Sequence, residues 1–212
     1  MQTYQITEYG NLNETQKLQA VDIFLEGFGH MMTFSKDKTV LRKLFFEIMN
    51  PHLFKCYVEQ EQVLGIMGIA TNKLRPLNFD INICRNLFGT TKGNILSRQM
   101  NAIFQAPVVK NDNELYIDIL ATAGTARGKG VATALLSHAF AMKKFEHCSI
   151  EVFSKNEAAL NLYKKVGFSI YKEEKFSLLR FAVSGMGYPI KMKKVLVHSE
   201  TALQKLYGCE PM

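Results

Sequence analysis

Residues 114–133 combine a strand, a glycine-rich turn and the start of a helix, an arrangement that can bind an anion. Polar and apolar side chains alternate over residues 114–122, as they do in a β-strand. The turn Ala123–Gly130 follows, and helical spacing begins at Val131. Such a turn exposes unpaired backbone N–H groups beside the positive end of the helix dipole. We therefore predict an anion site here, and phosphate is the anion that such sites most often bind.

The identities of these residues exclude two common phosphate motifs. A P-loop that used Lys129 would need a glycine and a hydroxyl residue at the positions of Ala123 and Gly130. A dinucleotide-binding fingerprint that began at Gly128 would need glycine or alanine where Thr133 stands. The predicted site must therefore belong to another class.

Two motifs carry a resemblance to a known family. The residues Arg127-x-x-Gly130-x-Ala132 resemble the Q/R-x-x-G-x-G/A signature of the GNAT N-acetyltransferase superfamily, whose loop amides hold the pyrophosphate of acetyl-coenzyme A (acetyl-CoA). Downstream, Asn156–Phe168 resembles the second motif of that family, N-x-x-A-x-x-L-Y-x-K-x-G-F, at every specified position. It follows a strand-like run, Ser149–Phe153, at the distance that the family shows.

The resemblance is detailed over residues 114–171 and loose elsewhere. It implies an α/β (α+β) fold with a mixed, mostly antiparallel sheet of about seven strands and flanking helices, in one domain over residues 1–212. It also implies a splay between the fourth and fifth strands that admits the pantetheine arm of acetyl-CoA. The donor-binding residues that it implies come from the strand end, the turn, the helix start and the second motif: Leu120, Ala121, Thr122, Arg127, Gly128, Lys129, Gly130, Val131, Ala132, Thr133, Asn156, Ala159 and Tyr163.

Acetyl transfer to an amine requires a base for the amine, stabilisation of the carbonyl oxygen, and a proton donor or solvent for the departing thiolate. Tyr163 resembles the tyrosine that, in many family members, directs its hydroxyl at the thioester sulfur. A phenol is protonated at neutral pH and can donate to a thiolate. The alternative is a core tyrosine that packs its helix against the sheet. Asn156 can cap the same helix and also contact the donor.

Asp118 is the candidate catalytic base. Regular alternation places four side chains on one face of the strand: Tyr116, Asp118, Leu120 and Thr122. The resemblance pairs the backbone of Leu120 and Thr122 with the pantetheine arm, so we expect Asp118 to point toward the acceptor. An unperturbed aspartate has a pKa near ~3.9 and is a weak base unless burial raises its pKa or it acts through water. Alternatively, Asp118 hydrogen-bonds to nearby backbone or orients the substrate ammonium, and Tyr116 is a weaker candidate for positioning.

The chain before the motif strand predicts a first strand near residues 4–7, two amphipathic helices and a hairpin over residues 54–70. Residues 74–110 depart from the family, whose connection here is a short loop. Apolar side chains from Ile95 to Phe104 have helical spacing, so we expect a helical insert. It could be an extra packing helix, a dimer contact, or a wall over the acceptor site.

The chain after the motif strand predicts a fifth strand at residues 149–153, a helix at 156–166 and a sixth strand from Phe168. A seventh strand is offered by residues 188–197, and a C-terminal helix is possible at residues 199–208.

Composition narrows the remaining possibilities. The net charge of +7 comes from dispersed basic residues, which favours a basic surface for an anionic cofactor over a nucleic-acid site. The four cysteines and five histidines show no zinc or triad spacing, so we expect reduced thiols and no metal. Apolar runs are too short for a membrane span and the N-terminus lacks signal-peptide regions, so we expect a cytoplasmic protein.

These observations predict an acetyl-CoA-dependent N-acetyltransferase in which the primary amine of an acceptor attacks the thioester directly. The alternative is a non-catalytic acyl-CoA-binding sensor on the same fold. The expected partner is an amine-bearing small molecule, and the chain is expected to be a monomer or a homodimer. The identity of the acceptor does not follow from the sequence.

Overall fold

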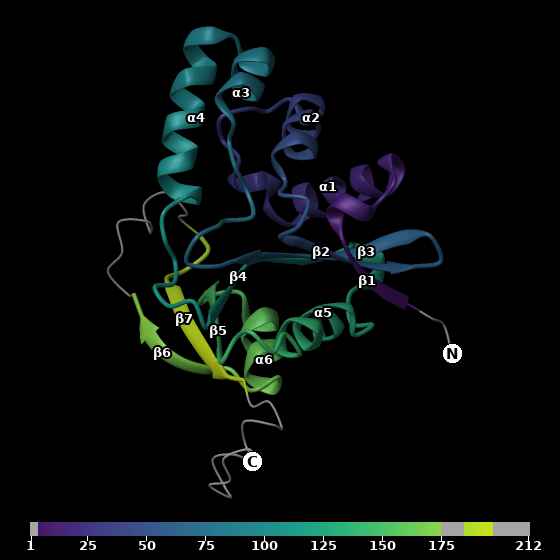
Figure 1. Ribbon diagram of the computed structural model, residues 1–212, viewed down its shortest axis with the longest axis vertical. Coiled ribbons are helices and arrows are strands. Elements are labelled where there is room, and N and C mark those ends of the chain that lie inside the picture. The colour runs from purple at the N-terminus through teal and green to yellow at the C-terminus, as the bar shows by residue number, and fades with distance from the viewer. Residues whose placement is uncertain (1–3, 175–184, 197–212) are drawn as a thin grey trace, which may run out of the picture.

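The computed structural model describes residues 4–174 and 185–196, in which one seven-stranded sheet separates two layers of helices (Figure 1). The strands are β1 (Tyr4–Glu8), β2 (Phe54–Glu59), β3 (Gln62–Ala70), β4 (Glu114–Thr122), β5 (His147–Phe153), β6 (Ser169–Glu173) and β7 (Pro189–Val195). The possible C-terminal helix at residues 199–208 lies outside the described residues.

The strand order is β1-β2-β3-β4-β5-β7-β6. Only the β4–β5 pair among these strands is parallel, and all the other neighbours run antiparallel. The predicted fold class, a mixed and mostly antiparallel sheet with flanking helices, is therefore confirmed.

Four helices lie on one side of the sheet and two on the other (Figure 1). The larger layer contains α1 (Glu14–Phe28), α2 (Lys38–Ile48), α3 (Ile81–Phe88) and α4 (Thr90–Phe104), and the smaller contains α5 (Val131–Phe140) and α6 (Glu157–Lys165). Short 3-10 turns are η1 (Tyr9–Asn11), η2 (Gly29–Met31) and η3 (Gly124–Ala126). Asn13 begins α1 with a reciprocal capping box to Gln16, and Asp37 caps α2.

Each helix layer packs its own hydrophobic core against the sheet. The first core lies under α1–α4 and is built around four fully buried aromatic rings: Phe24, Phe45, Phe54 and Phe79. The second core lies under α5 and α6, where Leu115, Leu135 and Leu136 are completely buried. Burial of this apolar surface on both faces of the sheet stabilises the layered arrangement.

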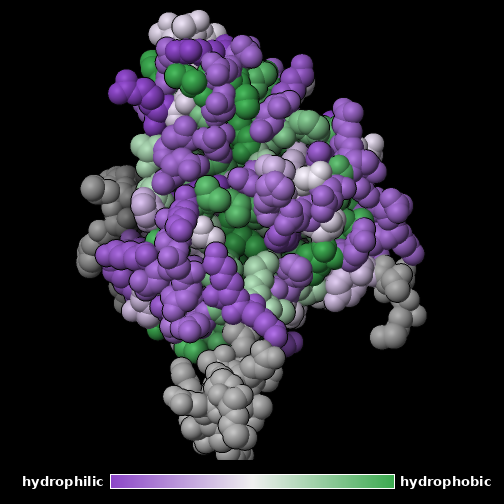
Figure 2. Space-filling view, viewed as in Figure 1, coloured by the Kyte–Doolittle hydropathy of each residue, from purple (hydrophilic) through white to green (hydrophobic). Residues whose placement is uncertain are grey.

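The insert at residues 74–110 contains two helices, α3 and α4, joined by a tight turn at Gly89, whose φ of +79° favours glycine. A Cβ at Gly93 would lie 2.6 Å from the Arg85 backbone, so the glycine lets the two helices approach closely. Phe104 of α4 stacks on Phe79 of the first core. Ile95 on α4 stays half-exposed, and Figure 2 shows hydrophobic residues among hydrophilic ones over this projecting pair of helices.

Strand β4 contains a β-bulge at Asp118. Against β3, Ile117 is paired with Ile69 and Ile119 with the adjacent Gly68, so Asp118 is the extra residue on β4. A bulge of this kind shifts the alternation of side chains between the two faces of a strand. The bulge is what decides the direction of every side chain that follows it on β4.

The prediction that Asp118 shares a strand face with Leu120 is therefore wrong. Ile117 and Leu120 pack against the second core, whereas Ile119 and Ala121 pack against the first. Asp118 contacts the segment that leads into α3, on the side of the first core. The prediction assumed a regular alternation of side chains, and the extra residue of the bulge breaks that alternation.

Candidate active site

The turn before α5 forms an open cradle of backbone amides. Gly128 and Gly130 have φ values of +76° and +83°, and a Cβ at either would meet no atom within 4 Å. The first hydrogen bond of α5 runs from the Ala134 N–H to the Gly130 carbonyl. The amides of residues 131–133 precede it and have no acceptor within the helix. Free amides, the helix dipole and empty space above two glycines are what a pyrophosphate requires, so the residues present fit this group.

A groove of about 800 Å³ extends from this cradle along β4 to α6. Its lining includes all the predicted donor-binding residues except Lys129, and among the further lining residues are Gly27 and Phe28 from the end of α1. Gly27 and Phe28 come from a segment more than ninety positions earlier in the chain, and no sequence motif marks them. The structure therefore brings the two family motifs and the end of α1 to one continuous surface.

Strands β4 and β5 separate beside the groove. Their parallel pairing runs from Glu114 with His147 to Ile117 with Ile150 and ends there, while β4 stays paired with β3 as far as Thr122. Among the described strands, none pairs with the β5-facing edge of β4 beyond Ile117. Such an edge can pair with an extended ligand in the manner of an added strand.

Tyr163 lies on α6 in the groove lining and is 6% exposed. Burial raises the pKa of its phenol, so the hydroxyl stays protonated over the whole neutral range. The ring packs edge-on against Phe168, and within the described chain the hydroxyl makes no hydrogen bond. Asn156, also in the lining, caps α6 by accepting from the Ala159 amide at 3.2 Å. The hydroxyl of Tyr163 is thus a proton donor without an acceptor among residues 4–174 and 185–196.

Glu26 of α1 holds the phosphate turn from the opposite side. Its carboxylate accepts from the Arg127 guanidinium at 2.7 Å and from the Gly124 amide at 3.3 Å. Both side chains of the ion pair are about half-exposed, at 47% and 64%. No local sequence pattern predicts this contact, because the two segments are about a hundred residues apart.

Asp118 is buried in a two-point ion pair with Arg75. Arg75 Nε and Nη2 donate to the two carboxylate oxygens at 2.9 and 3.0 Å, and Arg75 also donates to the Ala106 carbonyl at the end of the insert. The two side chains are 8% and 11% exposed. Burial raises the pKa of Asp118, and the adjacent guanidinium opposes that rise. The structure therefore places the predicted base beside the strand divergence, but with both oxygens engaged.

Glu151 of β5 is a second carboxylate at the same place. It is the first β5 residue beyond the last β4–β5 pair, and burial raises its pKa. The run Ser149–Phe153 contained a signal for it, because a glutamate inside an apolar strand is unusual and alternation sets it on the face opposite Ile150 and Val152. Tyr116 lies close to Asp118 and Glu151, and burial raises the pKa of its phenol as well.

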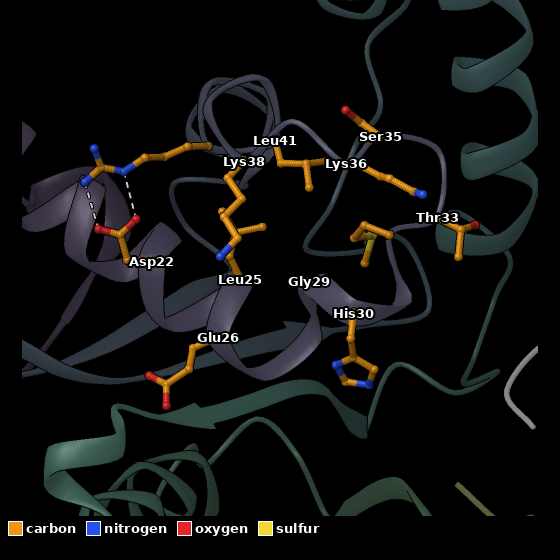
Figure 3. A pocket seen from close by; sticks show the side chains of 12 residues that line it. Asp22, Leu25, Glu26, Gly29, His30, Thr33, Ser35, Lys36, Lys38 and Leu41 are labelled. Carbon is orange, nitrogen blue, oxygen red and sulfur yellow. Dashed lines mark hydrogen bonds and ion pairs between the residues drawn. The ribbon is translucent and has the colours of Figure 1, made fainter. Parts of the chain in front are cut away.

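A second cavity, of about 880 Å³, lies where α1 ends and α2 begins (Figure 3). Glu26 and His30 point from it toward the sheet, and the ion pair between Asp22 and Arg42 closes one end. Glu26 belongs to this cavity and also contacts the phosphate turn, so the cavity and the groove meet at the end of α1.

Over residues 4–174 and 185–196, no cluster of three or more potential metal ligands occurs, and no helix is both long and apolar enough to cross a membrane. Cys56, Cys84 and Cys148 are buried free thiols outside the groove lining. Burial raises the pKa of Cys56 and of Cys148 to about 12. These three thiols are therefore not activated nucleophiles.

Comparison with solved structures shows the same fold in several acetyltransferases. An N-acetyltransferase from Staphylococcus aureus Mu50 matches with a TM-score of 0.59 and 18% identity over 90% of this chain and 100% of its own. A GCN5-related N-acetyltransferase from Kribbella flavida matches with a TM-score of 0.57 and 15% identity, covering 91% and 98%. A protein described as histone acetyltransferase HPA2 and related acetyltransferase, from Corynebacterium glutamicum, matches with 0.55 and 17%, covering 93% and 98%.

A search of curated protein sequences found no significant relative. A sequence model of the acetyltransferase (GNAT) family, in contrast, matches residues 32–168, which is more than half of the chain and includes both motifs. The fold agrees with that match. This chain belongs to the GNAT acetyltransferase family.

Proposed function

We propose that this protein transfers the acetyl group of acetyl-CoA to the primary amine of a small acceptor molecule by direct attack. One observation carries the proposal: the lining of a single groove includes both the amide cradle of α5 and Tyr163. A donor that binds by its phosphates at one end therefore presents a thioester to a protonated phenol at the other. Acetyl-CoA supplies an activated acyl group whose thiolate leaves once an amine has attacked.

The cradle and the open edge of β4 hold the donor in this proposal. Backbone amides of residues 130–133 bind the pyrophosphate, with Arg127 adding positive charge nearby. The unpaired edge of β4 at Leu120–Thr122 binds the pantetheine amides. Tyr163 donates its proton to the sulfur that leaves, because burial keeps the phenol protonated and no group in the described part of the chain accepts that proton.

Direct attack is supported by the state of the thiols. A covalent acyl-enzyme needs an activated nucleophile in the groove. Among the described residues, Cys56, Cys84 and Cys148 are buried outside the groove lining. In the proposal the amine of the acceptor is the nucleophile that meets the thioester.

A cationic acceptor is supported by the charge at the strand divergence. Asp118 and Glu151 place two carboxylates there; Arg75 pairs with Asp118, while the ammonium of Lys191 stays 3.8 Å from Glu151 and lies closer to Glu174. An acceptor ammonium can therefore be attracted to the Glu151 carboxylate. The cavity at the end of α1, which meets the groove at Glu26, offers room for the rest of a small acceptor.

Two measurements test the proposal. Calorimetry with CoA measures donor binding, and release of thiol from acetyl-CoA is then followed with spermidine, L-lysine methyl ester and an alanine-initiated tripeptide. Amine-dependent thiol release with a matching acetylated product supports the proposal. Tight CoA binding without thiol release from any of these amines identifies the acyl-CoA-binding sensor instead, and loss of both overturns the donor site.

A further inference from the structure

The two carboxylates at the strand divergence differ in what their oxygens can still accept. Both oxygens of Asp118 receive hydrogen bonds from Arg75. Glu151 makes no hydrogen bond within the described residues, and its nearest cation, Lys191 Nζ, lies 3.8 Å from one oxygen. The same ammonium of Lys191 lies 3.0 Å from Glu174 and is drawn to that residue. Glu151 therefore keeps the free lone pairs that a proton acceptor needs.

The backbone places Glu151 at the start of the gap between β4 and β5. Ile150 is the last β5 residue paired with β4, and from Glu151 onward β5 is bonded only to β7, where Glu151 faces Lys191. On its β4 side, Glu151 thus borders the gap between the two strands, where the edge of β4 is unpaired. Asp118 borders the same gap from the β4 side.

We infer that Glu151 accepts the proton of the acceptor ammonium, and that Asp118, held by Arg75, is a positioning residue for the bulge of β4. This inference rests on the proposed acetyl transfer and assigns the proton acceptor of that same site. It replaces Asp118 in the role that the sequence predicted for it.

The surroundings of Glu151 suit this role. Burial is the largest influence and raises the pKa of Glu151, the charges of Glu174 and Asp118 raise it further, and Lys191 and Lys172 lower it. On the β4 side, Tyr116 is buried next to the same group. A carboxylate whose pKa is raised toward the working pH is a better general base than an exposed glutamate.

The groups named above and solvent account for every proton and electron pair that moves in the acetyl transfer. The ammonium of the acceptor gives one proton to the Glu151 carboxylate, and the freed nitrogen pair forms a bond to the thioester carbon. The C–S bond breaks with its electron pair on sulfur, and Tyr163 gives its proton to that sulfur. After the attack the nitrogen loses a second proton to solvent, and the phenolate of Tyr163 takes up a proton from solvent. Glu151 then releases its proton to solvent.

The test compares kcat/KM against pH for the wild type, Glu151→Gln and the control Glu114→Gln. The acceptor is whichever amine of the three the wild type turns over fastest. Glu114 is a β4 carboxylate that accepts a hydrogen bond from Ser149 and forms an ion pair with Lys193. It lies where β4 and β5 are still paired, so Glu114→Gln makes the same chemical change outside the gap. We expect an ascending acidic limb in the wild type and the control. Glu151→Gln should lose the limb and fall ~100-fold or more at the plateau, with unchanged CoA affinity.

A second readout does not depend on turnover. In protein labelled with carboxyl-¹³C glutamate, the resonance absent from Glu151→Gln belongs to Glu151. We expect this resonance to titrate above an ordinary glutamate and at the midpoint of the kinetic limb. Asp118→Asn, where it folds, should keep the limb, because Asp118 does not take the proton.

The outcomes separate this inference from the proposed function. Thiol release by the wild type together with an unchanged limb in Glu151→Gln overturns the role of Glu151 and leaves acetyl transfer intact. A carboxyl resonance that titrates well away from the limb overturns it too. Absence of amine-dependent thiol release in a protein that binds CoA overturns the proposed function, and the proton acceptor with it.

Discussion

Arg75 Nε and Nη2 donate hydrogen bonds to the two carboxylate oxygens of Asp118, at 2.9 and 3.0 Å, and both side chains are almost fully buried. One partner leads into the insert and the other is the bulge residue of β4. The pair therefore connects the segment that contains α3 and α4 to the strand that borders the site. Arg75 also bonds to the Ala106 carbonyl at the far end of the insert, so both ends of the insert meet at this point.

Loss of Asp118 should destabilise the fold more than loss of a similar exposed aspartate. Asp118→Asn leaves the Arg75 charge buried without its counter-ion, for which we expect a cost of about 3 kcal/mol in the free energy of unfolding. Asp22→Asn is the control, since Arg42 also holds Asp22 by two points, both 2.7 Å, but with both side chains about half-exposed. Exposed pairs contribute about 1 kcal/mol or less. Urea unfolding of both variants checks this, and equal losses would contradict a structural role for the buried pair.

Gly130 should be needed for the donor and not for the fold. A Cβ at Gly130 has open space around it, so Gly130→Ala costs mainly the strain of a positive φ, about 1–2 kcal/mol. The same Cβ points into the cradle where the pyrophosphate is proposed to lie, and we expect CoA affinity to fall at least tenfold. Gly89→Ala is the control, because Gly89 also has a positive φ and open space, in the turn between α3 and α4. Calorimetry should find wild-type affinity in the control; wild-type affinity in Gly130→Ala would remove the cradle assignment.

Tyr163→Phe should lower turnover without unfolding the protein. The hydroxyl of Tyr163 makes no hydrogen bond in the described chain, so its removal should change the free energy of unfolding by less than about 1 kcal/mol. General acid catalysis contributes ~100-fold, so kcat should fall by that amount at unchanged CoA affinity. Tyr9→Phe is the control and should lower the free energy of unfolding without lowering kcat. Tyr9 donates to the Phe46 carbonyl at 3.1 Å and does not line the groove. A Tyr163→Phe enzyme with the wild-type rate in single-turnover measurements would make Tyr163 a packing residue.

Removing the charge of Glu26 should tighten CoA binding. Glu26→Gln keeps oxygen and nitrogen atoms near Arg127 and Gly124 but removes a negative charge beside the phosphate site. Because the pair is half-exposed, we expect only a few-fold gain in affinity at low salt, and salt should abolish it. Glu14→Gln makes the same change at the other end of α1 and should leave affinity unchanged. Weaker binding in Glu26→Gln would instead show that the carboxylate is needed to hold the turn.

The sequence by itself determined the two motifs, the fold class and most of the groove lining. This was possible because each of these rests on short-range chemistry. Glycines mark a turn, a capping residue marks the start of α6, and the hydrophobic period separates strands from helices. Gly130 and Tyr163 could be named from their neighbours in the chain alone.

Only the tertiary structure decided which charged groups meet at the strand divergence. The bulge of β4 reverses the side-chain alternation at Asp118. The sequence of β4 does not predict the bulge, because the extra residue is defined by the pairing of β4 with β3. Arg75 reaches Asp118 across forty-three positions, and Glu26 reaches Arg127 across one hundred and one. Glu151 is set beside Asp118 because β4 and β5 run parallel and part after Ile117. Such contacts depend on the path of the whole chain, so the role of each carboxylate could be assigned only after that path was known.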